Sequence, residues 1–259
     1  MIDNNIKRIT IEKVSKKFFP DFKNNEGALF RIISFLKKEN TIRHRREVQV
    51  LDNITFDVHS GEILGLIGKN GSGKSTLLRI IAGVYQADTG EVKIDGNVVY
   101  LTGTGQGSSP KLTMRENIYL MGSVMGLSQE EIRNRFDQIV EFSGLRDHVD
   151  IKIYQFSTGM ISRLNFSIVM HCLEYKKPDI LLLDEVLSAG GDIDFQEKAT
   201  KKMEELIKGG AAVILVSHSL STINDYCDNV IWLEKGNIKE IGKPKNIIKN
   251  YKKSNIKIK

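Results

Sequence analysis

This sequence of 259 residues has little cysteine, little proline and no long apolar run. Neither of its two cysteines, Cys172 and Cys227, has a Cys or His at metal-ligand spacing, so we expect reduced, partly buried thiols. With only 4 prolines and with 22 glycines in no repeat, the chain is neither proline-rich nor collagen-like. No apolar run approaches the ~20 residues of a membrane-spanning helix, and the first seven residues are too polar for a signal peptide. We therefore expect a cytosolic protein.

Charge is unevenly spread along the chain. Residues 1–50 carry 12 Lys/Arg and 6 Asp/Glu, residues 51–242 carry 19 and 26, and residues 243–259 carry seven lysines and no acid. An acidic middle argues against a nucleic-acid-binding protein. The basic ends predict contact with an anionic surface, and a merely solvated tail is the alternative.

Alternating apolar segments predict an α/β protein with an antiparallel portion near its N-terminus. The expected strands are 6–14, 54–58, 62–67, 92–94, 98–101, 180–183, 212–216, 230–233 and 238–241. The expected helices are 74–83, 114–125, 128–143, 158–175 and 194–208, and a basic helix or tail ends the chain. The fully apolar segments 180–183 and 212–216 are typical of buried strands in a parallel sheet.

A glycine-rich loop provides the strongest local motif. It reads Gly68-Lys69-Asn70-Gly71-Ser72-Gly73-Lys74-Ser75, is followed by Thr76, and matches G-x-x-x-x-G-K-[ST] between an expected strand and an expected helix. Backbone N–H groups of such a loop and the following helix N-terminus bind phosphate oxygens. Lys74 would reach the β- and γ-phosphates of a nucleotide, and the Ser75 hydroxyl would ligate Mg²⁺. A chance glycine-rich turn is the alternative.

Two carboxylates follow the apolar strand 180–183. Asp184 and Glu185 would lie at the carboxyl end of a buried strand, where open α/β sheets bind ligands. We expect Asp184 to hold Mg²⁺ and Glu185 to orient and deprotonate the attacking water. An ordinary strand end with solvated acids is the alternative, and the phosphate motif makes it less favoured.

Residues 156–160, Phe156-Ser157-Thr158-Gly159-Met160, open an expected helix. They resemble the signature motif of ATP-binding-cassette (ABC) ATPases, in the FSTGM form found in one branch of that superfamily. The resemblance implies that Ser157 and Gly159 contact the γ-phosphate of ATP held by the other subunit. A plain helix with a serine N-cap is the alternative.

Weaker matches to the same superfamily occur elsewhere. His218, after the expected strand 212–216, resembles the switch histidine that contacts the γ-phosphate. Phe18 stands where the family places an aromatic ring on adenine; Phe19 competes with it, and core packing is the alternative for both. Residues 188–192 resemble the loop that couples two subunits across the dimer interface.

Within the ABC superfamily, the sequence is most similar to ATPase subunits of bacterial polysaccharide exporters, which move O-antigen, capsule or teichoic-acid polymers. Four features carry this similarity: the long interruption 20–47, the segment 112–118 after a glycine-rich loop, the FSTGM signature, and Leu187–Gly190 followed by Phe195 and Gln196. The resemblance spans about residues 5–242.

The sequence departs from the family pattern in several places. Thr104 stands where most ABC ATPases have a glutamine that contacts Mg²⁺, and Gln106 is the nearest glutamine and the candidate for that role. The helix after the signature is about one turn longer than usual, and the loop 188–192 is one residue longer. The chain has no room after Lys259 for the sugar-binding domain that some O-antigen subunits carry.

The resemblance implies a P-loop NTPase fold of the ABC ATPase type. We expect a nucleotide-binding domain over 1–242, with a helical subdomain at about 105–178 that carries the signature, and a basic tail over 243–259. The implied cofactors are ATP and Mg²⁺. The implied partners are a second copy of the chain, an integral membrane permease, and a polysaccharide or lipid-linked glycan carried through it. The implied location is the cytoplasmic face of the inner membrane.

Two other functions stay open from the sequence. The first is an ATPase of a drug or small-solute exporter. The second is a non-transport ABC ATPase acting on DNA or ribosomes, which usually carries a coiled-coil insertion or a second cassette that this sequence lacks. Residues 20–47 and 103–109 are the candidates for the surface that faces the permease or the polymer.

Overall fold

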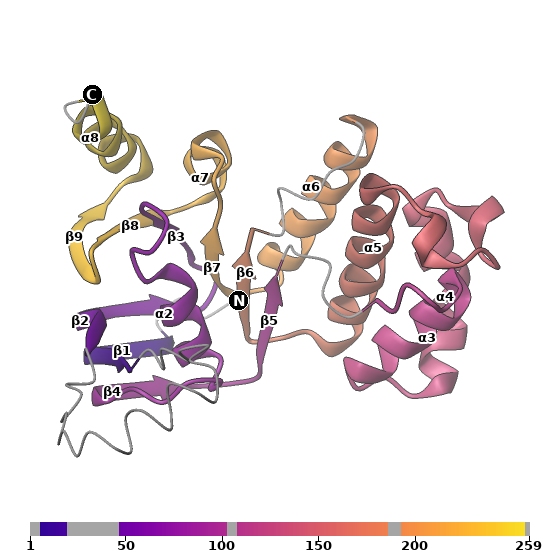
Figure 1. Cartoon of the computed structure of the whole chain (residues 1–259), viewed down its shortest axis with the longest axis horizontal. Coiled ribbons are helices and arrows are strands. Elements are labelled where there is room, and N and C mark those ends of the chain that lie inside the picture. Colours follow the sequence, from indigo (N-terminus) through magenta and orange to yellow (C-terminus); the bar gives the residue numbers. More distant parts are fainter. Residues whose placement is uncertain (1–5, 20–46, 103–107, 186–192, 257–259) are drawn as a thin grey trace, which may run out of the picture.

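The computed structural model describes residues 6–19, 47–102, 108–185 and 193–256 (Figure 1). An antiparallel sheet has the order β2-β1-β4 and a six-stranded sheet has the order β5-β6-β7-β3-β8-β9. Strands β5, β6, β7, β3 and β8 are parallel, whereas β9 pairs antiparallel with β8. The bounds are β1 (Lys7–Phe18), β2 (Val48–His59), β3 (Ile63–Ile67), β4 (Thr89–Ile94), β5 (Val98–Thr102), β6 (Ile180–Asp184), β7 (Ala212–Val216), β8 (Asn229–Glu234) and β9 (Asn237–Gly242).

Seven α-helices lie in the described part of the chain, and none of them has the length and apolar character that crossing a membrane requires. They are α2 (Lys74–Ile81), α3 (Met114–Val124), α4 (Gln129–Ser143), α5 (Thr158–Lys176), α6 (Ile193–Lys208), α7 (Leu220–Tyr226) and α8 (Pro244–Ile256). The sequence did not predict α7 or two short 3₁₀ helices at 146–148 and 153–155. It also ended β1 too early, because the strand passes several register shifts before it ends at Phe18.

The two faces of the central sheet are covered by different helices. Leu64 and Leu66 of β3 pack with Leu77 and Leu78 of α2. On the other face, Ile63 and Ile67 belong to the core that includes Phe166, Met170 and Leu173 of α5. This alternation follows from the two-residue period of a strand. As a result, α2 and α5 lie on opposite faces of the sheet, with β6 and β7 between them (Figure 1).

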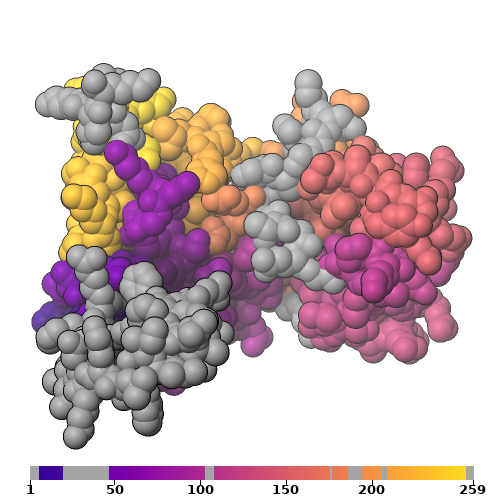
Figure 2. All heavy atoms as spheres, in the orientation of Figure 1, coloured from indigo at the N-terminus to yellow at the C-terminus, as the bar shows by residue number. Residues whose placement is uncertain are grey.

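A separate apolar core joins the helices α3, α4 and α5. Its buried side chains include Met114, Ile118, Ile132, Leu164 and Ile168. In the space-filling view, residues of α3, α4 and α5, coloured magenta to red, gather on one side of the molecule (Figure 2). The helical segment that the sequence predicts is therefore held together by its own core.

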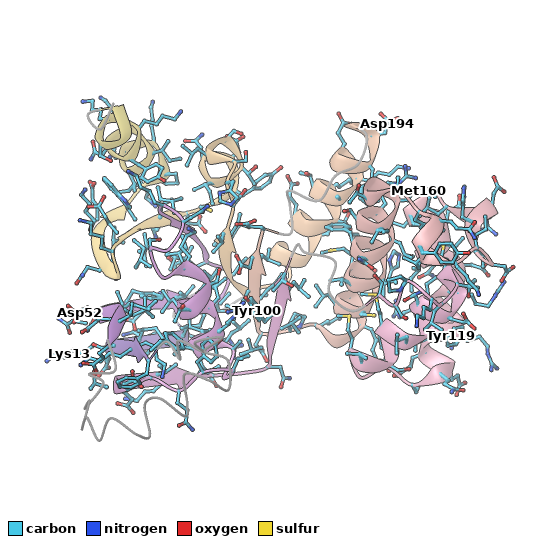
Figure 3. The ribbon with its side chains drawn as sticks, in the orientation of Figure 1. Lys13, Asp52, Tyr100, Tyr119, Met160 and Asp194 are labelled. Carbon is cyan, nitrogen blue, oxygen red and sulfur yellow. The ribbon has the colours of Figure 1, made fainter. Side chains whose placement is uncertain are left out.

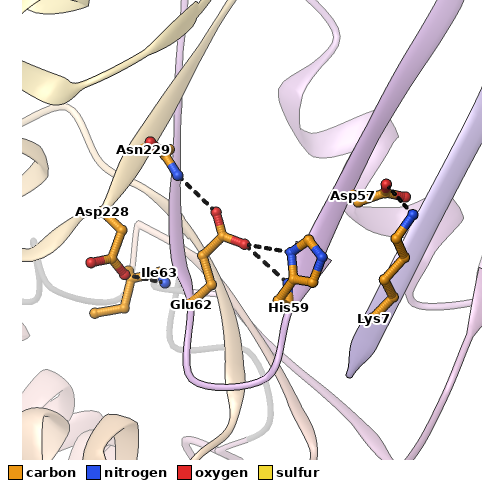
Figure 4. Close-up of polar contacts among 7 residues, drawn as sticks. All are labelled: Lys7, Asp57, His59, Glu62, Ile63, Asp228 and Asn229. Carbon is orange, nitrogen blue, oxygen red and sulfur yellow. Dashed lines mark hydrogen bonds and ion pairs between the residues drawn. The ribbon is translucent and has the colours of Figure 1, made fainter. Parts of the chain in front are cut away.

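The end of β3 that lies away from the glycine-rich loop is held by side-chain hydrogen bonds to neighbouring segments (Figure 4). The Asp228 carboxylate accepts from the backbone N–H of Ile63 at 2.9 Å. The Glu62 carboxylate accepts from the backbone N–H of His59 at 3.0 Å and from the Asn229 amide at 3.0 Å. These contacts fix the start of β3 against β2 and β8, and so fix the direction in which β3 leads into the loop.

The basic C-terminal segment forms α8 from residue 244 onward. Ile247 and Ile248 are buried, and the Tyr251 ring meets Trp232 of β8 edge to face at 5.3 Å. The segment thus packs on the sheet through one helix face, which is the helical alternative of the prediction.

Both cysteines are buried and neither forms a disulfide, as expected of reduced thiols. Burial raises the pKa of the Cys227 thiol to about 12, so this thiol stays neutral in the core.

Candidate functional site

Residues 68–76, here called the phosphate loop, connect the end of β3 to the first turn of α2. Gly73 precedes α2 with a φ of 106°, and a Cβ there would lie 2.9 Å from the backbone oxygen of Val50. A Cβ at Gly68 would collide with the backbone oxygen of Leu233. Only glycine fits at these two positions, because the obstructing atoms belong to the backbone.

Several hydrogen-bond donors of the phosphate loop are left available for a ligand. Gly73 supplies no side chain to cap the N-terminus of α2. The Ser72 hydroxyl is buried and has no hydrogen-bond partner among the described residues. A helix N-terminus without a cap and a buried orphaned hydroxyl both fit a bound anion. Asn70 and Gly71, at the tip of the loop, are exposed.

Lys74 begins α2 and points back along the phosphate loop. Its Nζ donates to the backbone oxygens of Gly68 at 2.8 Å and Lys69 at 3.1 Å. Burial lowers the pKa of Lys74, and the negative charges of Glu185 and Asp184 oppose that shift. The ammonium therefore lies within electrostatic reach of both carboxylates. Ser75 and Thr76, the next residues of α2, are half-buried.

Asp184 and Glu185 lie at the carboxyl end of β6, as the sequence predicts. Strand β7 lies between β6 and β3, so these carboxylates share one sheet edge with the phosphate loop. Glu185 has a φ of 61°, a left-handed conformation that is rare for a residue with a side chain, and its N–H donates to Val216 at 3.0 Å. Such conformations cluster at functional sites, because surrounding contacts have to enforce them.

His218 follows β7 and contacts the same carboxylate. Its Nε2 lies 2.6 Å from Oε1 of Glu185, and both side chains are partly exposed to solvent. The structure thus brings together Lys74, Asp184, Glu185 and His218, which are far apart in the sequence, at one edge of the sheet.

The residues that would hold Mg²⁺ are the Ser75 hydroxyl and the Asp184 carboxylate. Oxygen ligands suit this hard cation, which usually takes one or two carboxylates together with substrate phosphates. Within residues 6–19, 47–102, 108–185 and 193–256, no group of three His, Cys, Asp or Glu side chains could hold a metal ion without such phosphates. The donor set therefore fits a metal that arrives with a nucleotide. Thr104 and Gln106, the other candidate position, lie outside the described residues.

The signature residues lie at the start of α5. Ser157 is exposed and caps the helix, because its hydroxyl accepts from the backbone N–H of Met160 at 3.2 Å. Gly159 is the second residue of α5. No hydrogen bond joins either residue to residues 68–76 within the described chain. Figure 3 labels Met160 at one end of α5, across the molecule from α2. The subunit-coupling loop expected at 188–192 lies outside the described residues.

Phe18 ends β1 and is half-buried. Its ring meets Tyr85 edge to face at 5.5 Å, and the Lys16 ammonium lies 5.4 Å from its centroid. Phe19, the competing candidate, is 56% exposed. Phe18 is therefore packed on one side, while Phe19 has few contacts that would hold its ring in place.

Sequence reasoning missed two residues beside this site. The Tyr100 phenol of β5 donates to Oδ2 of Asp184 at 3.1 Å. The Arg79 guanidinium of α2 lies 5.8 Å from the centroid of the Tyr85 ring and acts electrostatically on the phenol of Tyr100. The alternation of residues 98–102 could have indicated which face Tyr100 occupies, but not its partner in another strand.

Comparison with known proteins gives a family match and similar relatives. A family model described as ABC transporter matches residues 51–188. The chain is 37% identical over 246 residues to the O-antigen export system ATP-binding protein RfbB of Klebsiella pneumoniae, covering 95% of this chain and 98% of that protein. It is 39% identical over 254 residues to the teichoic acids export ATP-binding protein TagH of Lactococcus lactis subsp. lactis, covering 97% of this chain and 52% of that protein.

Solved structures support the same fold. An ATP-binding subunit of an ABC transporter superposes with a TM-score of 0.67 at 22% identity, covering 94% of this chain and 92% of that chain. A dimeric ATP-binding cassette in a post-hydrolysis state, bound to ADP and Pi, also gives 0.67 at 22% identity, covering 91% and 98%. The expected ABC ATPase fold is confirmed. Because the family model matches more than half of the chain and the relatives align over nearly all of it, the chain belongs to the ABC transporter family of ATPases.

Proposed function

We propose that this chain is the ATP-hydrolysing subunit of a bacterial exporter that moves a cell-surface polysaccharide across the inner membrane. The observation that carries the proposal is the end-to-end similarity to an O-antigen export ATP-binding protein, at 37% identity over 95% of this chain and 98% of that protein. The similarity to a teichoic-acid export protein supports the same class of substrate.

In this proposal, the phosphate loop binds the phosphates of ATP. Its backbone N–H groups and the Ser72 hydroxyl donate to phosphate oxygens, and the free N-terminus of α2 adds its positive end. Lys74 would exchange its bonds to the backbone oxygens of Gly68 and Lys69 for charge-assisted bonds to the β- and γ-phosphates. Phe18 would stack on the adenine ring.

Ser75 and Asp184 would hold Mg²⁺, which neutralises phosphate charge when it is bound. Glu185 would orient the attacking water and accept its proton as the general base. His218 would contact the γ-phosphate. Its Nε2 lies 2.6 Å from Oε1 of Glu185, so the imidazole also fixes the orientation of that carboxylate.

Ser157 and Gly159 would act on ATP held by a second copy of the chain. They lie at the start of α5, whereas the phosphate loop leads into α2 on the opposite face of the sheet. An arrangement in which each copy supplies both a phosphate loop and a signature gives a C2 dimer with two ATP sites. Closure of this dimer on ATP, and its reopening after hydrolysis, would move the permease.

The partner in the membrane would be an integral permease through which the polymer or its lipid-linked form passes. Of the candidate permease-facing segments, 20–46 and 103–107 lie outside the described residues. The subunit would sit at the cytoplasmic face of the membrane. Lys245, Lys249, Lys252 and Lys253 are exposed on α8, and each lysine near an anionic leaflet contributes about 1 kcal/mol at low salt.

Because α8 packs on the sheet, its lysines are better neutralised than deleted. Changing these four lysines to glutamine should lower cosedimentation with anionic liposomes at low salt, while high salt should abolish the difference. Equal binding by the variant and the wild-type protein at low salt would remove the membrane role of α8.

The export function is tested in cells that lack the gene. We expect loss of surface-glycan staining, restored by the wild-type gene and by Lys201→Ala, which removes one exposed lysine of α6. A gene carrying Lys74→Ala should not restore staining. Normal surface glycan in the deletion strain would defeat the proposal.

A further inference from the structure

Strand β5 places Tyr100 beside the carboxylate proposed to hold Mg²⁺. In the parallel pairing of β5 with β6, Tyr100 lies opposite Leu182 and Thr102 lies opposite Asp184. Side chains two residues apart share a face, so Leu182 and Asp184 lie on one face of β6. Tyr100 and Leu182 both belong to the core under α2. Tyr100, which is labelled in Figure 3, therefore lies on the face of the central sheet that α2 covers, and Asp184 lies on the same face.

The hydrogen bond of Tyr100 has a defined direction. Its phenol donates to Oδ2 of Asp184 at 3.1 Å. An ionised carboxylate can only accept, so the single proton of the phenol points at Asp184. The Arg79 guanidinium lies near the same phenol and acts on it electrostatically. Arg79 belongs to the helix that begins with Lys74, so α2 and Asp184 both lie beside this tyrosine.

Arg79 also lies beside the Tyr85 ring. Its guanidinium carbon is 5.8 Å from the centroid of that ring, which in turn meets Phe18 edge to face. Arg79 therefore lies between the proposed adenine-stacking ring and the tyrosine that contacts Asp184.

We propose that Tyr100 is a positioning residue for Asp184. By occupying Oδ2, its phenol fixes the plane of the carboxylate and leaves Oδ1 for the divalent cation or a water bound to it. Partners of this kind orient metal-ligating carboxylates, and their loss typically costs ~10–100-fold in metal affinity. The inference rests on the proposed role of Asp184 as the magnesium carboxylate.

The test measures metal binding without turnover. Mn²⁺ is titrated into the purified full-length protein in the presence of a non-hydrolysable ATP analogue, and free Mn²⁺ is followed by electron paramagnetic resonance. Tyr100→Phe keeps the ring and removes the hydroxyl, so we expect Mn²⁺ affinity to fall about tenfold. Binding of the same analogue in EDTA should stay unchanged, because the phosphate loop is intact.

Tyr85→Phe is the matched control, because it removes another phenol beside Arg79, one that does not touch Asp184. It should leave Mn²⁺ affinity close to that of the wild type. In an Asp184→Ala background, Tyr100→Phe should cause no further loss, since the group that it positions is gone. A Tyr100→Phe protein with wild-type affinity, or one whose loss persists without Asp184, would overturn the inference.

Arg79→Met provides a second route if Tyr100→Phe does not fold. Arg79 is exposed, and methionine is a good helix former, so the change should spare the fold while removing the positive charge that lies beside the phenol of Tyr100. We expect a smaller loss of Mn²⁺ affinity than Tyr100→Phe gives, and unchanged affinity would count against the inference. If the wild-type and Asp184→Ala proteins bind Mn²⁺ equally well, Asp184 does not hold the metal ion. That result would contradict the proposed magnesium site rather than the role of Tyr100.

Discussion

The N-termini of α2 and α5 are both proposed to contact phosphate, yet they differ in the structure. At α2, Gly73 offers no capping side chain, and the neighbouring Ser72 hydroxyl is buried without a partner among the described residues. At α5, the Ser157 hydroxyl is exposed and already caps the helix by accepting from Met160. The first helix end is thus prepared for an anion that the chain binds alone, whereas the second is stable without one.

This difference bears on the order of events. A hydrogen-bond donor without a partner contributes the most binding free energy when phosphate binds, because no internal hydrogen bond has to break. At α5, the Ser157 oxygen already satisfies a helix N–H, and its own proton can be donated only to a phosphate that another subunit brings. We therefore expect ATP to bind first at the phosphate loop of each chain, and the signature to engage only when two chains meet.

The largest effect is expected from Glu185→Gln. The change removes the proposed base and leaves the phosphate loop intact, so turnover should fall about 10²–10⁴-fold while ATP binding is retained. The N-terminus of α2 in one chain and the N-terminus of α5 in the other should then stay bound to the same ATP. The protein should therefore elute as an ATP-dependent dimer in size-exclusion chromatography. Wild-type turnover would remove Glu185 from its assigned role.

Lys74→Ala should weaken phosphate binding at the N-terminus of α2 and leave the N-terminus of α5 unchanged. The ammonium lies at the start of α2, where its charge would pair with phosphate, so nucleotide affinity should fall at least about tenfold. Titration with a fluorescent nucleotide measures this loss. Lys245→Ala, which removes an exposed lysine of α8, should bind as the wild type does. Equal affinities for all three proteins would contradict the phosphate-loop assignment.

The motifs that the sequence predicted are those in which neighbouring residues act together. The phosphate loop, the pair at 184–185 and the start of α5 are local, and each occupies the element expected for it. Short apolar runs likewise predicted the buried strands of the central sheet. Helix α7 was missed because seven residues offer too short a pattern for the helical period.

Contacts between distant segments could not be predicted from local patterns. The hydrogen bond from Tyr100 to Asp184 joins two strands that are far apart in the sequence and depends on the pairing of β5 with β6. The conformation of Glu185 depends on its bond to Val216 of β7. Neither composition nor periodicity contains such pairings, because they arise only when the sheet is assembled.

Ser72→Ala tests whether the buried hydroxyl beside the N-terminus of α2 binds the nucleotide. Removing a buried hydroxyl that has no partner among the described residues should leave the free energy of unfolding without nucleotide unchanged, or raise it by about 1 kcal/mol. Nucleotide affinity should fall several-fold, about the loss of one hydrogen bond to a charged group. Ser60→Ala is the matched control: its buried hydroxyl donates to Gly210 at 2.8 Å, so stability should fall and affinity should not. A Ser72→Ala protein that binds nucleotide normally would show that this hydroxyl does not contact phosphate.

Ser157→Ala addresses the N-terminus of α5, where only a small effect is expected. Losing an N-cap should cost about 1 kcal/mol in the free energy of unfolding. Ser128→Ala removes the corresponding cap of α4, where the Ser128 hydroxyl accepts from Glu131, so denaturant unfolding should give a similar cost for both variants. Only Ser157→Ala, introduced together with Glu185→Gln, should weaken the ATP-dependent dimer, because only that hydroxyl is proposed to donate to a phosphate of ATP held by the partner. Equal dimerisation in the two serine variants would make Ser157 a helix cap and nothing more.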